Sequence, residues 1–211
     1  MNIVSLAALS FVALTTTTGF GDDNDPGKVL RCLKQYDAEV FANVGRSELA
    51  LFEAQRKYYA RECEAAEKIN VAKVDLRDAS EWADIFERRR MLPQAISLVE
   101  RLEAKAKANR FNLQRRLLRL YAGANLASKG SDLFYRMKPN GPAQAISLAT
   151  GAAEIVTSIH KAQGADKAIQ LLEAAKQALR PDNVSNPELK AKTEDMQKQL
   201  TKFEANVRSG D

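Results

Sequence analysis

The chain has 211 residues, of which 45% are hydrophobic and 28% charged, and its formal net charge at pH 7 is +5. This length supports one domain with a core of its own or a short array of repeats, and the hydrophobic content excludes an intrinsically disordered chain. Strong helix formers dominate, whereas runs of alternating Val, Ile and Thr are missing. The composition therefore predicts an all-α protein.

Residues 1–21 have the pattern of a secretory signal peptide. The run 3–14 is nearly all apolar, and it is shorter than the roughly 20 residues that a membrane-spanning helix needs. Small and hydroxyl residues follow it up to Gly21, and an acidic segment comes next. We predict that this leader is cleaved and that the protein is periplasmic or secreted. An uncleaved anchor and a buried apolar helix are the alternatives.

Residues 22–75 are predicted to form a helical hairpin. Asp25 and Pro26 together make a good helix start, so the first helix should run to about residue 41. The second should run from about 47 to 70. Cys32 and Cys63, the two cysteines of the chain, fall one on each helix. In an oxidising compartment we expect them to form a disulfide, and two unlinked buried thiols are the alternative.

Residues 76–182 are predicted to hold a series of shorter helices. They should cover about 78–90, 93–108, 113–130, 133–137, 142–163 and 166–179. The segment 138–142, with two prolines and a glycine, is the clearest break in the chain. Asn186 and Pro187 then open a last helix, so that residues 183–211 form a C-terminal helix and tail.

The spacing within residues 77–181 resembles the tetratricopeptide repeat. The first unit is carried by Trp82, Ala83, Phe86, Ala95, Val99 and Leu102, and the last by Ile155, Ile159, Ala168, Leu172 and Ala175. A poorer middle unit contains Leu117, Leu118, Tyr121, Gly130, Phe134 and Met137. The small residues Ala95, Gly130 and Ala168 are 35 and 38 positions apart, against about 34 in the family. The resemblance implies stacked helical hairpins, an architecture that binds other proteins.

Two other interpretations of the helical pattern remain open. The pentapeptide QAISL occurs at 94–98 and again at 144–148, and the proposed units place its two copies on different helices of the repeat. This spacing does not fit a regular repeat. A different helical-hairpin solenoid and an ordinary α-helical bundle are therefore the alternatives to a short tetratricopeptide-like solenoid.

Positive charge is concentrated in residues 88–119. Ten basic residues stand there against Glu100 and Glu103, which gives a local charge of +8. We predict a basic face that binds a partner, made of Arg88, Arg89, Arg110, Arg115, Arg116 and Arg119. Arg115, Arg116 and Arg119 lie within about one helical turn, so local acids should not neutralise all three charges. Leu113, Leu117 and Leu120 take the opposite, buried side, which should turn these arginines outward. Arg115→Glu with Arg119→Glu should therefore leave the melting temperature nearly unchanged. A solvated face without a partner is the alternative.

The sequence offers no positive evidence for an enzyme. His160 is the one histidine of the chain. The sequence contains no phosphate-binding glycine loop, no nucleophile signature and no metal motif. We therefore expect no catalytic residues, no metal and no cofactor. The most economical function is an exported adaptor or scaffold in a cell envelope, with a structural subunit of an envelope-spanning secretion or transfer apparatus as the alternative. The expected partner is an acidic protein face or another anionic envelope component, because export makes nucleic acid an unlikely partner.

Overall fold

The computed structural model describes residues 25–42, 44, 47–180 and 184–210, and every regular element in those ranges is a helix. The all-α prediction is confirmed. The elements are α1 (Pro26–Ala42), α2 (Glu48–Lys68), the short 3-10 helix η1 (Val71–Lys73), α3 (Ala79–Arg88), α4 (Leu92–Lys105), α5 (Arg110–Gly123), α6 (Ala127–Arg136), α7 (Pro142–Gln163), α8 (Ala165–Ala178) and α9 (Pro187–Ser209).

Helix starts follow the capping residues in the sequence. The Asp25 carboxylate accepts a hydrogen bond from the Lys28 amide at 2.7 Å in the first turn of α1. The Asn186 side chain accepts bonds from the amides of Glu188 and Leu189 at the start of α9. Both caps satisfy amide groups that have no partner inside the helix. Short polar signals therefore fix where these helices begin.

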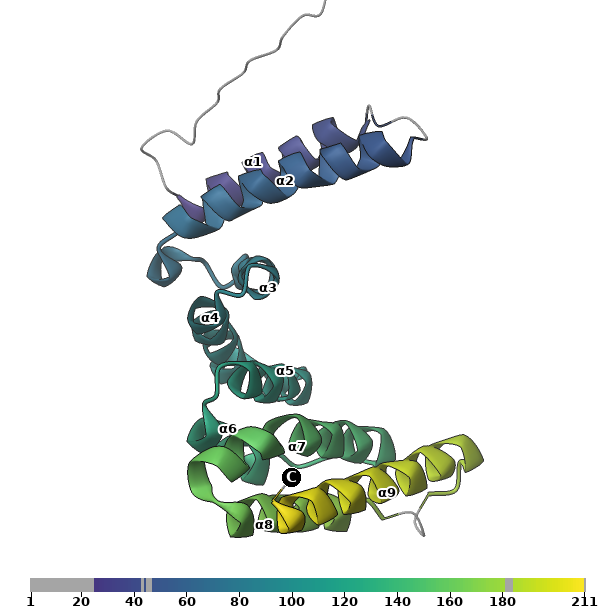
Figure 1. Cartoon of the computed structure of the whole chain (residues 1–211). Helices are drawn as coiled ribbons and strands as arrows, with labels where there is room; N and C mark the ends of the chain where they lie inside the picture. Colours follow the sequence, from purple (N-terminus) through teal and green to yellow (C-terminus); the bar gives the residue numbers. More distant parts are fainter. Residues whose placement is uncertain (1–24, 43, 45–46, 181–183, 211) are drawn as a thin grey trace, which may run out of the picture.

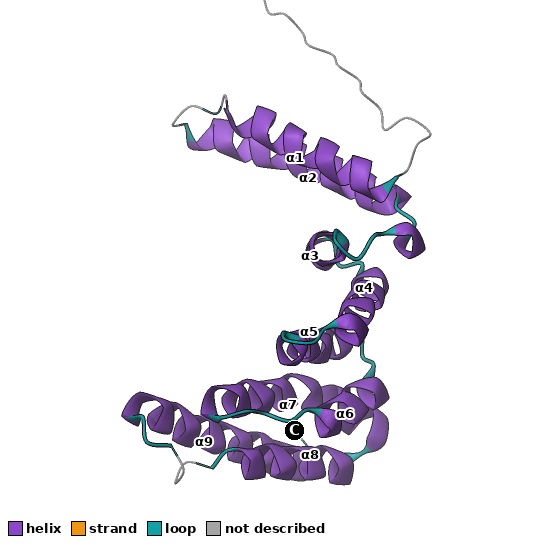
Figure 2. Ribbon diagram, turned by 180° about the vertical axis from the view of Figure 1, so that it is seen from behind, coloured by secondary structure: helices purple, strands orange, loops and turns teal. Residues whose placement is uncertain are grey.

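The helices together form an open C (Figure 1). The hairpin of α1 and α2 makes one arm, and α7, α8 and α9 make the other. The helices α3 to α6 join the arms, with α3, α5 and α7 on the inner side of the C and α4 and α6 on its outer side, as the view from behind also shows (Figure 2). The two helices of each pair, α3–α4, α5–α6 and α7–α8, pack against each other. Each pair also contacts the next one along the chain.

The joints of the first two pairs have the same backbone geometry. Of the described residues other than glycine, Arg90 and Asn125 alone have positive φ, at 59° and 55°. Each joint has the same pair of backbone hydrogen bonds, which are Arg90 N to Glu87 O and Met91 N to Phe86 O in one, and Asn125 N to Ala122 O and Leu126 N to Tyr121 O in the other. The two joints therefore repeat with a spacing of 35 residues. The α7–α8 joint differs, since Gly164 occupies it with φ 90°.

Small residues allow the helices of the stack to approach closely. A Cβ atom built on Gly130 would lie 1.6 Å from Ile155 Cδ1, a distance that no real contact has. Ala95 and Ala168, which the repeat pattern equates with Gly130, are fully buried. Large side chains fill the remaining space, as Trp82 and Phe86 do with ring centroids 5.7 Å apart. The pattern of small and large residues thus determines how closely the hairpins pack.

The predicted disulfide is wrong. Cys32 on α1 and Cys63 on α2 are free, and they are not within disulfide distance. The two helices do pair as a hairpin, but α1 turns Val29, Leu30 and Leu33 toward its neighbours and leaves Cys32 exposed. A side chain next to a buried position on a helix points about 100° away from it. The sequence placed the cysteines on the correct helices but could not orient them.

The predicted leader, residues 1–21, lies outside the described residues. Among the helices of the described part, none combines the length and the hydrophobicity that are needed to cross a membrane.

Candidate functional site

A groove on the inner side of the C is the best candidate for a functional site. It has a volume of about 480 Å³. Three successive inner helices contribute to it, since α3, α5 and α7 each provide side chains. We call it the inner groove, and it is lined by Asp84, Asn112, Arg115, Arg116, Arg119, Ser147 and Glu154. Residues separated by 70 positions in the sequence therefore meet on one surface.

Two of the groove's arginines are held firmly between helices. Arg115 on α5 donates two hydrogen bonds of 2.8 Å, one to each carboxylate oxygen of Glu154 on α7. Arg116 donates to Asp84 and to Glu87 on α3. Their side chains are only 17% and 16% exposed. Because a bidentate arginine–carboxylate pair is geometrically specific, these pairs fix the relative positions of α3, α5 and α7.

Arg119 is the most accessible cation of the groove. Its Nη2 atom donates to Glu87 Oε2 at 2.7 Å, yet 60% of its side chain remains exposed. Asp84, on the opposite wall, is 53% exposed. The groove thus presents one accessible positive group and one accessible negative group. A bound segment would meet both signs of charge.

The expectation that acids cannot neutralise these arginines is wrong. Arg115, Arg116 and Arg119 all pair with carboxylates. The carboxylates belong to α3 and α7 and lie 29 to 39 residues away in the sequence. A count of charges within one stretch omits acids that the fold brings in from elsewhere. For the same reason the expectation that all three point outward holds for Arg119 and fails for the other two.

Arg88 and Arg89 bind a single buried carboxylate where α2 meets α3. Glu62 is 0% exposed, and it accepts 2.7 Å hydrogen bonds from both guanidinium groups. The Arg89 guanidinium also lies 4.8 Å from the centre of the Tyr59 ring. Burial of Glu62 raises its pKa, but the bonds from the two arginines outweigh burial and hold that pKa below its ordinary value. Burial, followed by the neighbouring Glu62 charge, raises the pKa of Tyr58 to about 12.

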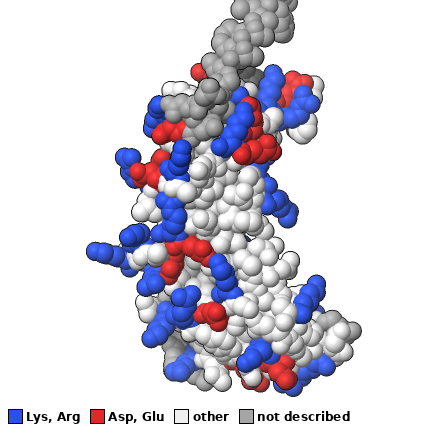
Figure 3. All heavy atoms as spheres, turned by 90° about the vertical axis from the view of Figure 1, so that its left-hand side faces the viewer, with Lys and Arg blue, Asp and Glu red and all other residues white. Residues whose placement is uncertain are grey.

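The sixth predicted arginine, Arg110, lies apart from both groups. It donates a 2.7 Å hydrogen bond to Glu103 and joins the end of α4 to the start of α5. Arg101, another cation of the same stretch, donates to the carbonyls of Val71 and Val74 and holds η1 in place. The six predicted arginines therefore occupy three settings, which are the inner groove, the α2–α3 junction and the α4–α5 joint. The outer side of the C shows positive and negative side chains interspersed around an uncharged area (Figure 3).

Sequence reasoning missed the acidic and polar members of the groove. Asp84, Asn112, Ser147 and Glu154 were not singled out, because each looks like an ordinary residue on a solvated helix. A usable signal was present in the repeat pattern itself. Had α3, α5 and α7 been treated as equivalent inner helices, their polar positions would have been predicted to share one surface.

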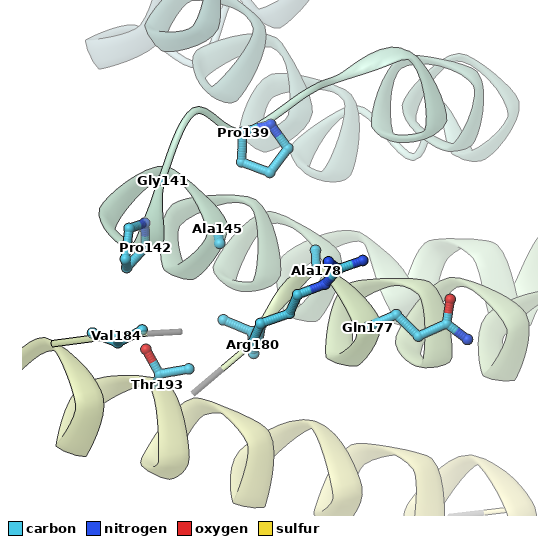
Figure 4. Close-up of a pocket in the computed structure, with 10 residues that line it drawn as sticks. Pro139, Gly141, Pro142, Ala145, Gln177, Ala178, Arg180, Val184 and Thr193 are labelled. Atoms are coloured by element: carbon cyan, nitrogen blue, oxygen red, sulfur yellow. The ribbon is translucent and has the colours of Figure 1, made fainter. Parts of the chain in front are cut away.

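A second pocket lies between the starts of α7 and α9 and the end of α8 (Figure 4). Its volume is about 500 Å³. Arg180 is the one charged side chain among its lining residues, and it is exposed. Thr193, which is buried, donates its hydroxyl hydrogen to the carbonyl of Leu189 at 2.7 Å. This lining offers no pair of groups suited to acid–base or nucleophilic chemistry.

The described residues contain no group of three or more His, Cys, Asp or Glu side chains that could hold a metal ion. Comparison of the chain with protein-family models, with curated proteins and with solved structures finds no match.

Proposed function

We propose that this protein is an exported, tetratricopeptide-like helical scaffold that binds a segment of a partner protein in its inner groove. It acts by binding, with no catalysis and no cofactor, in the periplasm or outside the cell. The observation that carries the proposal is the inner groove, where three consecutive inner helices present polar and charged side chains on one continuous surface. Stacked hairpins use such surfaces to hold peptides and proteins.

The repeated joint supports the tetratricopeptide-like interpretation. Arg90 and Asn125 occupy the same left-handed conformation, 35 residues apart, within the same hydrogen-bonded turn. A residue other than glycine or asparagine costs about 1 kcal/mol in this left-handed conformation. Arg90 adopts it nevertheless, which indicates that the packing of the helices requires the turn. Left-handed turns of this kind end many helices, so the support comes from the 35-residue spacing at which the two joints recur.

The charges of the groove favour a protein partner over a polyanion. Three carboxylates stand beside the three arginines of the groove, so its net charge is close to zero. A nucleic acid or an anionic envelope polymer gains affinity from uncompensated positive charge, which this site lacks. A polypeptide segment can place an acidic residue against Arg119 and a donor against Asp84. We therefore infer an extended or helical segment that carries at least one acidic side chain.

Site-specific crosslinking tests the binding proposal. A photoreactive residue at Ser147, inside the groove, should give a discrete crosslinked product in the native host. The same residue at Tyr135, which is 54% exposed on α6, serves as the matched control and should give none. The Ser147 product should disappear in Arg119→Glu. Equal crosslinking from both positions, or a product that is indifferent to Arg119→Glu, would reject the groove as the binding site.

Two substitutions in the groove separate binding from stability. Arg119→Glu should weaken partner binding and change the free energy of unfolding by less than about 1 kcal/mol, because the Arg119 side chain is 60% exposed and Arg116 still pairs with Glu87. Arg115→Glu should destabilise the fold by roughly 1–3 kcal/mol, since it removes a half-buried bidentate pair and faces Glu154 with a second negative charge. Chemical denaturation measures both effects. If the two substitutions proved equally harmless, the pair would not hold α5 to α7.

Export is tested by the amino terminus of the protein purified from its host. Sequencing should show a chain that begins close after Gly21, recovered from the envelope or the medium. Recovery of the chain with residues 1–21 intact from the cytoplasm would exclude export while leaving the groove unaffected.

The alternative function, a structural subunit of an envelope-spanning apparatus, is favoured by one feature. The α1–α2 hairpin projects from the rest of the molecule and exposes large apolar side chains. A subunit of an assembly would use such an arm to contact its neighbours. Small-angle scattering distinguishes the two functions, because the scaffold should stay curved and form nothing larger than a closed dimer, whereas an assembly subunit should form straight, extended oligomers.

A further inference from the structure

The α2 helix carries a line of large exposed side chains at heptad spacing. Leu49, Phe52, Arg56 and Tyr59 recur at intervals of three and four residues, so they share one side of the helix, and we call them the α2 stripe. Leu49 is 68% exposed, Phe52 64% and Tyr59 44%. An exposed apolar line of this kind marks a surface that another molecule covers.

Within the described part of the chain, the α2 stripe stays largely exposed. The α1 helix packs on a different side of α2, where Ala54 is buried and the rings of Phe41 and Tyr58 meet with centroids 6.3 Å apart. At the inner end of the stripe, Arg89, which follows α3, lies over the Tyr59 ring. The stripe therefore begins at the α2–α3 junction and continues outward along the projecting arm (Figure 1).

The stripe is complementary to itself when two copies of α2 lie antiparallel. With a two-fold axis level with Ala54, Leu49 faces Tyr59 of the second copy and Phe52 faces its Arg56. Glu53, next to Phe52, comes within reach of the same arginine. Neither Glu53 nor Arg56 forms an ion pair with any residue in the described part of the chain. In the two-fold arrangement Glu53 of each copy pairs with Arg56 of the other, so the contact contains two such ion pairs.

We propose that two copies of this chain associate through the α2 stripe, with Arg56 of each copy against the Phe52 ring and the Glu53 carboxylate of the other. An arginine over an aromatic face is a favourable contact, and the molecule already contains one in Arg89 on Tyr59. The two hairpins would then make a four-helix arrangement, which covers the stripe on both copies. The contact area is small, so the dimer is reversible, with a dissociation constant of roughly micromolar or weaker.

Sedimentation of the full-length protein over a series from about 1 µM to about 1 mM tests the proposal. Wild type should pass from monomer to dimer. Phe52→Glu should abolish the dimer, and Glu53→Arg or Arg56→Glu alone should weaken it at least about tenfold. Tyr135→Glu, at an exposed aromatic residue on α6, is the matched control and should dimerise like wild type. Circular dichroism should show unchanged helix content in all four variants.

Mixing the two charge variants is the decisive measurement. Glu53→Arg sets like charges against each other in its own dimer, and so does Arg56→Glu. In the mixed dimer the two introduced side chains carry opposite charges and face each other, while the unchanged Arg56 of the first variant faces the unchanged Glu53 of the second. Both contacts are attractive again, so the 1:1 mixture should associate more tightly than either variant alone. A wild type that remains monomeric at about 1 mM, a dimer indifferent to Phe52→Glu, or a mixture no tighter than its components would each overturn the proposal.

Discussion

The α1–α2 hairpin and the hairpin stack that follows it are both helical, yet they bury very different amounts of apolar surface. In α7 eight residues are buried, among them Ile155, Val156 and Ile159. In α2, a helix of similar length, the buried residues are Ala54, Glu62, Ala65 and Ala66. Since burial of apolar area provides most of the stabilising free energy, the stack is stable through its own core. The stability of the hairpin depends on its contacts with the stack.

Polar contacts attach the hairpin to the stack, beside apolar residues such as Val29 and Leu33 that belong to the same buried cluster as Trp82. The Trp82 indole N–H on α3 donates to the Pro26 carbonyl at 3.2 Å, and Glu62 on α2 receives Arg88 and Arg89. Lys34 and Glu81 add an exposed ion pair at 2.7 Å. The comparison indicates that the arm should open at a lower free energy than the stack unfolds. The following predictions test this difference, from the largest effect to the smallest.

Removing a large aromatic side chain should lower the free energy of unfolding much more in the stack than in the hairpin. Trp82→Ala leaves a cavity in a fully buried site and removes the bond to Pro26. We expect a loss of about 3–5 kcal/mol in the free energy of unfolding. Phe52→Ala on the hairpin should cost less than about 0.5 kcal/mol, measured at a concentration where the protein is monomeric. Urea denaturation measures both, and similar costs would mean that Phe52 is as tightly packed as Trp82.

Glu62→Ala should destabilise the α2–α3 junction by about 3 kcal/mol, because it leaves two arginines without the carboxylate that both of them bind. Hydrogen exchange should show faster exchange in α1 and α2 and little change in α7 and α8. Glu64→Ala is the matched control on the same helix. Its pairs with Arg61 and Lys68 lie on the surface, so its cost should stay below about 1 kcal/mol. Uniform destabilisation of the whole chain by Glu62→Ala would contradict an arm that opens separately.

Gly130→Ala should destabilise the stack by about 1–3 kcal/mol, because the new methyl group overlaps Ile155, which is fully buried and has no room to move. Gly123→Ala is the control within the stack. A methyl group there lies 3.3 Å from Leu92 Cδ1, and the gain in helix propensity should make the change neutral or slightly stabilising. Thermal denaturation of the pair measures the effect. Equal melting temperatures would show that α6 and α7 are not in close contact.

Acid should weaken the junction before it weakens the core of the stack. The pKa of Glu62 lies below its ordinary value of 4.5, so the unfolded state takes up its proton first as pH falls. The stability that Glu62 contributes is therefore complete above the unfolded pKa and is lost as pH falls through the folded pKa. Comparing the pH dependence of wild type with that of Glu62→Ala isolates this group. Identical pH profiles would mean that the pKa of Glu62 is the same in the folded and the unfolded protein.

The sequence determined the fold class and most of the helices. Helix formers, capping residues such as Asp25 and Asn186, and breaks at Pro142 and Gly164 act within a few residues, so local physics is enough to read them. The same holds for the close-packing positions Ala95, Gly130 and Ala168, because a small residue inside an apolar pattern marks a place where two helices approach closely. The α3–α4 and α7–α8 joints were placed correctly, at Pro93 and Gly164. The α5–α6 joint was not, because the helix expected over 113–130 ends at Gly123 and the helix expected over 133–137 begins at Ala127. The left-handed turn at Arg90 could not be foreseen.

Only the tertiary structure decided which charges meet and which side chains face each other. The pairs of Arg115 with Glu154 and of Arg88 and Arg89 with Glu62 join residues 26 to 39 positions apart, and no local pattern encodes them. The same limit explains the failed disulfide, since the rotation of α1 about its own axis turns Cys32 outward while placing Leu33 inside. Helix formation depends on neighbours in the sequence, whereas the facing of one helix toward another depends on the packing of the whole chain.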